Sequence, residues 1–260
     1  MIRVAVVGAA GRIGAEVCRA VSDTDDCVLV AAIDPPQAGA SLREVTGADS
    51  DVVVAGDLEA VVDTGAEVAI EFTGPATVGA NLLWLLEHDI HTVVGATGIS
   101  EADLARAAAL AADGPANALV APNFAIGAVL LMRFAMEAAQ HLPHVEVIEL
   151  HHDAKLDAPS GTALRTAELI QQVRSERPVV PDGDDAHPGA RGTDHHGVRV
   201  HSVRLPGLVA HQEVIFGGVG QTLTLRHDSV DRSSFMPGVL LACRRVGGLD
   251  GLVVGLEHLL

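Results

Sequence analysis

Residues 2–14 read IRVAVVGAAGRIG, an apolar run followed at once by a turn with three glycines. The apolar run at residues 2–7 is typical of a parallel strand covered on both faces. The turn has the spacing GxxGxxG at Gly8, Gly11 and Gly14, which differs from the common GxGxxG. Between a strand and a helix, such glycines allow a tight turn and let a pyrophosphate approach the helix N-terminus. The stretch therefore predicts a dinucleotide-binding βαβ unit; the alternative is that the glycines only pack a helix on a sheet.

The alternation of apolar runs and helical segments continues as far as residue 121. A helix at residues 15–21 and a strand at residues 28–33 complete the first unit. Further strands are predicted at residues 67–73, 91–95 and 118–121, with helices at residues 76–88 and 100–112 between them. Strands that alternate with helices at this spacing predict an α/β fold with a Rossmann-like, doubly wound parallel sheet.

The pattern changes after residue 123. Helices at residues 127–141 and 162–174 and strands at residues 145–150, 198–205, 209–216 and 221–227 predict a smaller α+β domain with an open mixed or antiparallel sheet. Residues 177–196 are rich in Pro, Gly, Asp and His, and they predict a long loop or a lid. A last helix at residues 233–246 is expected to return to the first domain. The predicted boundaries are residues 1–123 with 233–260 for a dinucleotide-binding domain, and residues 124–232 for a substrate-binding domain.

The composition narrows the class of partner. Of 260 residues, 48% are hydrophobic and 20% are charged, and no apolar run reaches the roughly 18 residues of a membrane span. A formal net charge of −17 argues against nucleic acid or an anionic membrane as a partner and favours small molecules. Cys18, Cys27 and Cys243 lack metal or redox spacing, and no basic leader precedes the first strand, so a reducing cytoplasm is expected.

Asp34 follows the second predicted strand, 20 residues after Gly14. An acid in this place can accept hydrogen bonds from the adenosine ribose, which favours NADH; the alternative is a turn residue before two prolines. Arg12 in the glycine turn suits the 2′-phosphate of NADPH, so both cofactors are predicted. Later strands end in short segments that are expected to line the nicotinamide half of the site or to be ordinary turns: Phe72-Thr73, Gly95 to Gly98, and Ala121 to Phe124.

Titratable groups gather in residues 149–163, which read ELHHDAKLDAPSGTA. His151 and His152 can exchange protons near neutral pH. Lys155 is the only lysine in the chain, and its ammonium can hold an anionic substrate or protonate an intermediate. Adjacent histidines on an extended chain point in opposite directions, so no metal site is predicted.

A helix is expected to begin just after these groups. Ser160 is a suitable N-cap, and it places the amides of Gly161 and Thr162 at a helix N-terminus that can bind a carboxylate. The segment therefore predicts a pocket for a small acid; the alternative is a solvated surface loop.

This segment resembles the signature of the dihydrodipicolinate reductase family, also called 4-hydroxy-tetrahydrodipicolinate reductase. The family pattern is E-x-x-H-x-x-K-x-D-x-x-S-G-T-A, and every fixed position matches. The glycine turn with Arg12-Ile13, Phe72-Thr73, residues 121–124 and residues 209–214 are also similar, so the resemblance covers nearly the whole chain. One departure is Gly-Ala-Thr-Gly at residues 95–98, where the family usually has Gly-Thr-Thr-Gly; the lost hydroxyl removes a hydrogen bond worth about 1 kcal/mol.

The resemblance implies NAD(P)H-dependent reduction of dihydrodipicolinate, formed from 4-hydroxy-tetrahydrodipicolinate, to tetrahydrodipicolinate in the diaminopimelate route of lysine biosynthesis. It implies that His151 is a proton donor or acceptor, that Lys155 is the proton donor, and that the substrate carboxylates contact His152, Gly161 and Thr162. It implies a homotetramer built through the sheet of the second domain. The dinucleotide contacts that it implies are Gly8, Ala9, Ala10, Gly11, Arg12, Ile13, Asp34, Phe72, Thr73, Gly95, Ala96, Thr97, Ala121, Pro122, Asn123 and Phe124.

Two other functions stay open. Another Rossmann oxidoreductase of amino-acid metabolism, such as a semialdehyde dehydrogenase, would need a catalytic cysteine, and the three cysteines are poorly placed for that role. A non-catalytic dinucleotide sensor would keep the glycine turn but would have no reason to retain His151, His152 and Lys155 together.

Overall fold

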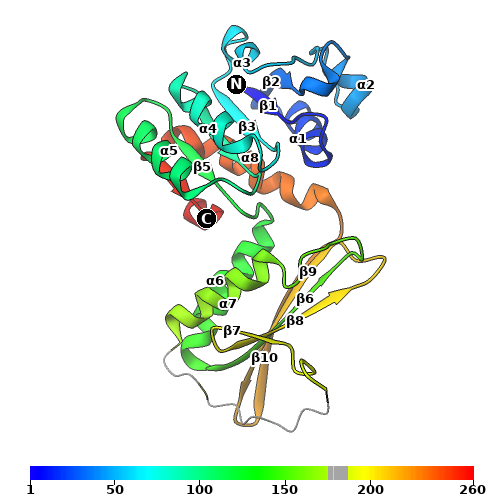
Figure 1. The fold of residues 1–260 in the computed structure, drawn as a ribbon, viewed down its shortest axis with the longest axis vertical. Coiled ribbons are helices and arrows are strands. Elements are labelled where there is room, and N and C mark those ends of the chain that lie inside the picture. Colours follow the sequence, from blue (N-terminus) through cyan, green and yellow to red (C-terminus); the bar gives the residue numbers. More distant parts are fainter. Residues whose placement is uncertain (175–177, 179–186) are drawn as a thin grey trace. The chain divides into compact units, whose positions relative to one another are not determined.

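The chain divides into two compact units (Figure 1). The computed structural model describes residues 1–174, 178 and 187–260. The first unit comprises Met1–Phe124 and Phe235–Leu260, and the second comprises Ala125–Ser234. Much of the loop or lid predicted at residues 177–196 lies outside the described residues.

A six-stranded parallel sheet forms the first unit, in the order β11-β5-β4-β3-β1-β2. This confirms the predicted doubly wound sheet. The order reverses between β1 and β3, and in open α/β sheets ligands bind at such a switch point, beyond the carboxyl ends of the strands. The strands are β1 (Ile2–Val7), β2 (Cys27–Ile33), β3 (Val68–Glu71), β4 (His91–Val94), β5 (Ala118–Val120) and β11 (Leu252–Val254).

Helices complete the first unit in two pairs. Helix α1 (Arg12–Ser22) contacts α8 (Met236–Arg245), and α4 (Val78–Glu87) contacts α5 (Glu101–Asp113). The short helices α2 (Leu42–Thr46) and α3 (Glu59–Asp63) fill the connection between β2 and β3. These two helices and β11 were not predicted, because elements of three to five residues are too short to show a hydrophobic period.

A mixed five-stranded sheet forms the second unit, in the order β10-β9-β6-β8-β7. Strands β6 and β8 are parallel, and the other neighbours are antiparallel. The parallel pair follows from α7 (Gly161–Val173), which lies between β6 and β8 in the sequence and returns the chain to the same edge. The strands are β6 (His144–His151), β7 (Thr193–His195), β8 (Val198–Arg204), β9 (Ala210–Gly218) and β10 (Gln221–Ser229). Strand β7 lies within residues 177–196, so the prediction of a loop throughout that stretch was wrong.

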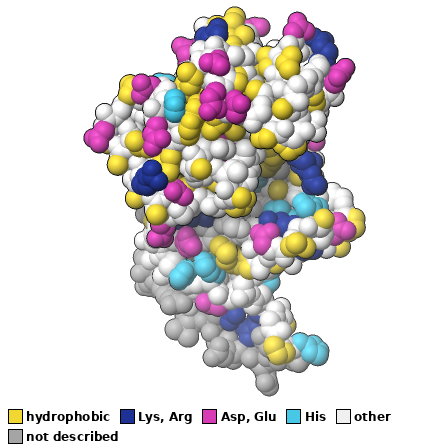
Figure 2. Space-filling model, turned by 45° about the horizontal axis from the view of Figure 1, so that its top comes forward, with side chains coloured by type: hydrophobic (Ala, Val, Ile, Leu, Met, Phe, Trp, Pro, Cys, Tyr) yellow, Lys and Arg dark blue, Asp and Glu magenta, His cyan; other side chains and the backbone are white. Residues whose placement is uncertain are grey.

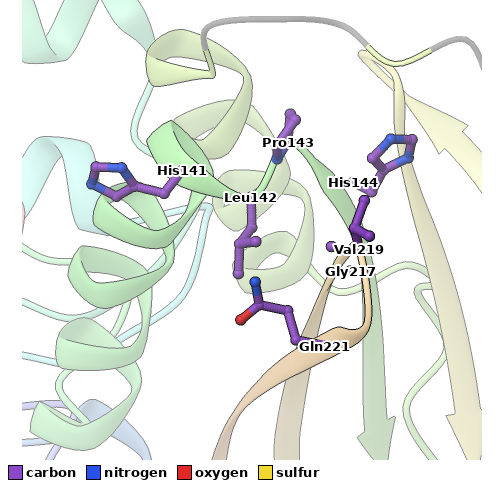
Figure 3. A pocket seen from close by; sticks show the side chains of 8 residues that line it. His141, Leu142, Pro143, His144, Gly217, Val219 and Gln221 are labelled. Carbon is purple, nitrogen blue, oxygen red and sulfur yellow. The ribbon is translucent and has the colours of Figure 1, made fainter.

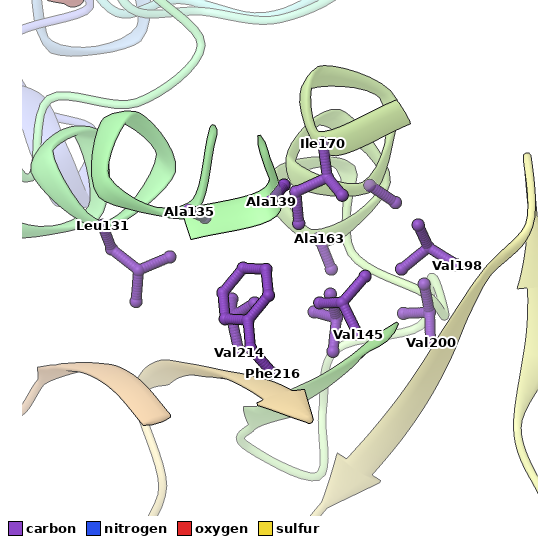
Figure 4. Packing of buried hydrophobic residues seen from close by; sticks show 12 residues of the cluster. Leu131, Ala135, Ala139, Val145, Ala163, Ile170, Val198, Val200, Val214 and Phe216 are labelled. Atoms are coloured by element: carbon purple, nitrogen blue, oxygen red, sulfur yellow. The ribbon is translucent and has the colours of Figure 1, made fainter. Parts of the chain in front are cut away.

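Helices α6 (Ile126–His141) and α7 cover one face of this sheet (Figure 1). Figure 4 shows Phe216 and Val214 from β9 and Val145 from β6 packed beneath Ile170 of α7. Each such side chain stabilises the unit by roughly 1.5–3 kcal/mol relative to an exposed position. The same alternation along β6 places Glu149 on this inner face, fully buried at the end of the core. No helix within the described ranges is both long and apolar enough to cross a bilayer.

Candidate active site

The glycine turn lies at the switch point of the parallel sheet, between β1 and α1. Gly8 has a φ of +82°, and a Cβ added there would lie 2.8 Å from the carbonyl oxygen of Phe72. A Cβ on Gly14 would lie 2.0 Å from the carbonyl oxygen of Gly8. Both obstacles are backbone atoms, so these positions require glycine. The turn is held against β2 as well, because the amides of Gly8 and Ala9 donate to the carbonyl of Ile33 at 2.8 and 3.1 Å.

The N-terminus of α1 is open to an anion. The helix begins at Arg12 after the N-cap Gly11, and no side chain of the described residues caps it. The N–H groups of a first turn have no acceptor inside the helix, and the helix dipole favours negative charge there. Oδ2 of Asp34 accepts a hydrogen bond from the amide of Ala10 at 3.0 Å, which places this carboxylate beside the turn. Arg12 is exposed at the start of the helix.

An apolar cavity of about 180 Å³ opens beside the turn. A dry cavity of about 150 Å³ can hold benzene, so this volume admits one flat six-membered ring. The rings of Phe72 and Phe124 lie 5.8 Å apart at 52°, and a Cβ on Gly95 would lie 2.2 Å from two ring atoms of Phe72. The structure thus brings six predicted residues together and adds Phe235, which was not predicted. The lining residues are Ile13, Phe72, Gly95, Pro122, Asn123, Phe124 and Phe235.

Four other predicted cofactor residues are close in sequence to the lining residues but do not line the cavity. Ala96 and Thr97 follow the end of β4, and Thr97 is exposed. Ala121 is buried, and its amide donates to the carbonyl of Val94 at 2.9 Å, a contact that extends the sheet. Thr73 is partly exposed directly after Phe72.

A buried carboxyl group, that of Glu71, accepts hydrogen bonds from Thr73. Glu71 ends β3 and is fully buried, and its Oε1 accepts hydrogen bonds from the amide of Thr73 at 3.2 Å, from the Thr73 hydroxyl, and from Nδ2 of Asn81 at 3.1 Å. Burial raises the pKa of Glu71, and these hydrogen bonds only partly oppose the shift. The signal that could have found Glu71 is an acid at the end of the otherwise apolar strand Val-Ala-Ile-Glu.

The residues of the 149–163 segment are organised around Glu149 in the second unit. Arg204 on β8 donates from its two Nη atoms to the two carboxylate oxygens of Glu149, each at 2.8 Å. Nδ1 of His151 lies 2.5 Å from Oε2 of Glu149, and the amide of Ser160 donates to Oε1 at 3.2 Å. One buried side chain therefore connects β6, β8 and the start of α7.

These contacts keep the carboxyl group of Glu149 ionised. Burial alone would raise the pKa of Glu149, but hydrogen bonds from His151, Arg204 and Ser202 outweigh it and lower the pKa to about 2. Glu149 is therefore an anion at neutral pH, and an ionised carboxylate only accepts hydrogen bonds. The proton of a neutral His151 must then sit on Nδ1, which leaves Nε2 as the atom that can exchange a proton.

Lys155 lies in the turn after β6 and is about one quarter exposed, with Nζ 2.8 Å from Oδ1 of Asp157. That contact lowers the pKa of Asp157. The carbonyl of Asp157 in turn accepts a hydrogen bond from Nη2 of Arg204 at 2.6 Å. His152 is partly exposed, and its carbonyl accepts from the amide of Lys155 at 3.2 Å.

Helix α7 begins where the sequence predicts. The Ser160 hydroxyl oxygen accepts from the amide of Ala163 at 3.3 Å, which confirms the predicted N-cap. Gly161 is exposed, and a Cβ added to it would meet no atom within 4 Å. Its amide and that of Thr162 belong to the first turn of the helix, the part of a helix that is suited to anion binding.

A larger hollow of about 620 Å³ lies elsewhere in the second unit. Figure 3 shows Leu142 and Gln221 facing one another, between the end of α6 and the turn that joins β9 to β10. The hollow includes His144, the first residue of β6, whereas His151 is the last. Seven steps of a strand span about 23 Å, so this hollow is separate from the Glu149 cluster.

A doubly wound parallel sheet with a glycine turn at its switch point, joined to a second unit with a mixed sheet and charged groups around Glu149, is the architecture of a two-domain oxidoreductase of the Rossmann type. Two protein-family models identify the family within this class of oxidoreductases. Residues 2–124 match the model "Dihydrodipicolinate reductase, N-terminus", and residues 127–260 match "Dihydrodipicolinate reductase, C-terminus". The chain belongs to the dihydrodipicolinate reductase family, which confirms the resemblance seen in the sequence.

Individual relatives match over the full length. The chain is 52% identical to the 4-hydroxy-tetrahydrodipicolinate reductase of Nocardia farcinica, covering 100% of this chain and 98% of the relative. It is 48% identical to that of Desulfitobacterium hafniense, with the same coverage. The dipicolinate-bound dihydrodipicolinate reductase from Paenisporosarcina sp. TG-14 has a TM-score of 0.89 and 43% identity, with 100% of each chain covered.

Proposed function

We propose that this chain catalyses the NAD(P)H-dependent reduction of dihydrodipicolinate, formed from 4-hydroxy-tetrahydrodipicolinate, to tetrahydrodipicolinate in the diaminopimelate route of lysine biosynthesis. The observation that carries the proposal is the Glu149 cluster. The short segment that Glu149 organises carries the imidazole of His151, the ammonium of Lys155 and the N-terminal turn of α7. Each of these groups suits a small unsaturated dicarboxylate that must receive a proton.

The first unit offers a place for the cofactor. The stretch from Gly8 to Gly14 has no room for a Cβ at either of these two glycines, and its backbone amides at the uncapped end of α1 suit a pyrophosphate. Asp34 would accept hydrogen bonds from the ribose of NADH, and Arg12 would pair with the 2′-phosphate of NADPH. The 180 Å³ cavity would admit the nicotinamide ring. When bound, the reduced nicotinamide supplies a hydride.

The second unit supplies the proton and holds the substrate. The amides of Gly161 and Thr162, together with His152, would bind a substrate carboxylate at the end of α7. Addition of a hydride to a conjugated imine leaves an electron-rich product that needs one proton, and the ammonium of Lys155 would donate it. His151 would exchange a proton at Nε2, because Glu149 keeps Nδ1 protonated. Solvent then restores the proton of Lys155.

Both ligands are anions, and the protein carries a formal net charge of −17. Figure 2 shows acidic side chains spread over the visible face without a single large patch. Repulsion from such scattered charges is screened within roughly 8–10 Å at ordinary salt. The two helix N-termini, Arg12 and Lys155 would supply the local positive potential that the ligands need.

The cysteine-dependent alternative has no support in the structure. All three cysteines are free and buried. Burial raises the pKa of Cys18 and of Cys243 to about 12, and it also raises the pKa of Cys27. A thiol that stays protonated is a poor nucleophile.

We further propose that the first unit binds the dinucleotide and that the second binds substrate and forms a homotetramer through its sheet. Residues Ile148, Leu150 and Ile215 point away from the face covered by α6 and α7, and they are partly exposed, as an interface would require. Light scattering at micromolar concentration tests the tetramer. Reduced thiols agree with a cytoplasmic location.

The reaction is tested with the freshly condensed product of pyruvate and aspartate semialdehyde, following the oxidation of NADH and of NADPH separately at 340 nm. The proposal predicts oxidation that depends on the condensation product and that is lost in Lys155→Ala. Oxidation at the same rate without the condensation product, or none with either cofactor, would contradict it.

A further inference from the structure

Three side chains that could bind a metal ion lie near the middle of α7, away from its N-terminal turn. Glu168 on α7, His195 at the end of β7 and the next residue, His196, each offer one ligand atom, and these atoms all lie within 4.8 Å of one another. Oε1 of Glu168 and Nε2 of His195 are 3.5 Å apart. None of the three takes part in the proposed reduction.

The backbone explains why two adjacent histidines reach the same side. Residues on an extended strand alternate, which would separate the two rings. His196, however, has a φ of +53°, and Gly197 after it has a φ of +81°. His195 pairs with Val198 across the hairpin, so His196 and Gly197 form a two-residue turn with positive φ at both positions, as a type I′ turn requires. The two imidazole rings consequently lie with their centroids 4.4 Å apart.

Histidine is compatible with this turn position. Asn, Asp or Gly is most common at the first central residue of such a turn, and histidine is also among the non-glycine residues enriched at positive φ. The turn is typical, since the amide of Gly197 donates to Oδ1 of Asp194 at 3.1 Å.

The ring of His195 is poorly satisfied without a further ligand. Its Nε2 is buried, and it makes no hydrogen bond among the described residues, although Oε1 of Glu168 is only 3.5 Å away. The other carboxylate oxygen of Glu168, Oε2, faces Nη1 of Arg165 at 3.4 Å, which leaves Oε1 directed at the histidine. A cation coordinated by both atoms would give the buried ring nitrogen a partner.

We propose that Glu168, His195 and His196 form a site for a divalent transition-metal ion, with Zn²⁺ as the preferred occupant. Two imidazoles and a carboxylate are a ligand set that Zn²⁺ uses, and its fourth position would hold water. With ligands at about 2.0–2.1 Å, two donors on one tetrahedral ion are separated by about 3.4 Å, close to the Glu168–His195 distance. The side chain of His196 is exposed and can close the remaining gap.

The ion would add a link between α7 and the hairpin of β7 and β8, where both Nη atoms of Arg174 already donate to the carbonyl of Gly197 at 3.3 Å. Strand β7 is an edge strand of three residues, and it touches α7, the helix whose first turn carries Gly161 and Thr162. A metal bound to α7 and to the hairpin of β7 and β8 stabilises the folded unit by mass action. The site would therefore hold the hairpin on the helix without entering the reduction itself.

The test is a calorimetric titration of the full chain with Zn²⁺ after removal of metal by EDTA. We expect a site with one Zn²⁺ per chain whose affinity falls at least tenfold in Glu168→Gln and in His196→Asn. Asn accepts positive φ, so the second variant keeps the turn and removes only the imidazole. The matched control is His258→Asn, which changes an exposed histidine of the other unit and should leave the Zn²⁺ affinity unchanged.

Two further measurements separate this site from weak binding elsewhere on a histidine-rich chain. Co²⁺ in place of Zn²⁺ should give the visible absorption of a nitrogen-ligated, low-coordinate ion, and His196→Asn should remove it. At free Zn²⁺ of 100 times its dissociation constant, the melting temperature should rise by about 5 °C in the wild type and by much less in Glu168→Gln. Zn²⁺ affinity that is equal in the wild type and His196→Asn, or no binding at 1 mM Zn²⁺, would overturn the proposal. A shift in melting temperature that is equal in Glu168→Gln would overturn it as well.

Discussion

Replacement of Glu149 by Gln removes the charge that organises the 149–163 segment. The carboxyl is fully buried, and its pKa falls from 4.5 to about 2 in the folded protein. A shift of about 2.5 units corresponds to about 3.4 kcal/mol of folding free energy at neutral pH. Removal of one partner of a buried ion pair typically costs about 3–5 kcal/mol, which agrees with this magnitude. Glu149→Gln should therefore unfold with a free energy about 3 kcal/mol below that of the wild type at pH 7.

The sign of the pH dependence follows from the lowered pKa. The stabilisation is fully present above pH 4.5 and is lost as the pH falls through about 2. Linkage then predicts that the gap between wild type and variant shrinks from about 3.4 kcal/mol at pH 7 to about 1.4 kcal/mol at pH 3. Urea unfolding followed by circular dichroism at several pH values measures this gap.

The matched control is Glu146→Gln on the same strand. Glu146 is half-exposed and lies 2.8 Å from Nε2 of His201. An exposed pair of this kind contributes less than about 1 kcal/mol, so this variant should remain close to the wild type. A loss under 1 kcal/mol for Glu149→Gln at pH 7, or a gap that does not narrow toward pH 3, would refute the reasoning.

Four further substitutions test the two halves of the site. Lys155→Ala should lower turnover by about 100-fold or more while NADH affinity changes little, as expected for a general acid. Steady-state kinetics measures turnover and calorimetry measures NADH affinity; an equal loss of turnover and of affinity would exclude Lys155 as the general acid. Asp34→Ala should raise the ratio of kcat/KM for NADPH over NADH by about tenfold, because a hydrogen bond to a charged group is lost; an unchanged ratio would show that Asp34 does not bind the ribose. Gly14→Ala places a Cβ 2.0 Å from the Gly8 carbonyl and should cost about 1–3 kcal/mol in urea unfolding and abolish NADH binding; near-native affinity would contradict the tight turn. Burial raises the pKa of Glu71, so the stability that this group contributes is full below pH 4.5 and is lost as the pH rises through its pKa in the folded protein. Glu71→Gln should therefore reduce the dependence of the unfolding free energy on pH, measured by urea unfolding. The same pH dependence in variant and wild type would contradict the raised pKa.

The parallel sheet could be predicted because its strands are short apolar runs and its turn needs glycines for steric reasons. Gly8 and Gly14 lie against backbone atoms, so the requirement is local and is visible in the sequence. The cap at Ser160 was predictable for the same reason, since its partner is only three residues away.

Residues that act across long sequence separations could not be predicted. Arg204 pairs with Glu149 from 55 residues away, and its strand shows only an ordinary alternation. Phe235 lies beside Phe124 in the apolar cavity because the last helix returns to the first unit, but nothing in the local pattern marks it as a lining residue. The pairing of His195 with His196 depends on one positive φ, a property of the hairpin that the dipeptide does not reveal.

The central claim is that a hydride and a proton are added to a cyclic dicarboxylate, with the proton coming from the Lys155 region. It is tested most directly by reducing the freshly made condensation product with NADH deuterated at the reactive C4 position, in ordinary water, and measuring the mass of the product. We predict one deuterium on a ring carbon of tetrahydrodipicolinate, and a rate of label transfer that collapses in Lys155→Ala. A product without deuterium, or label transfer that is undiminished in Lys155→Ala, would contradict the account.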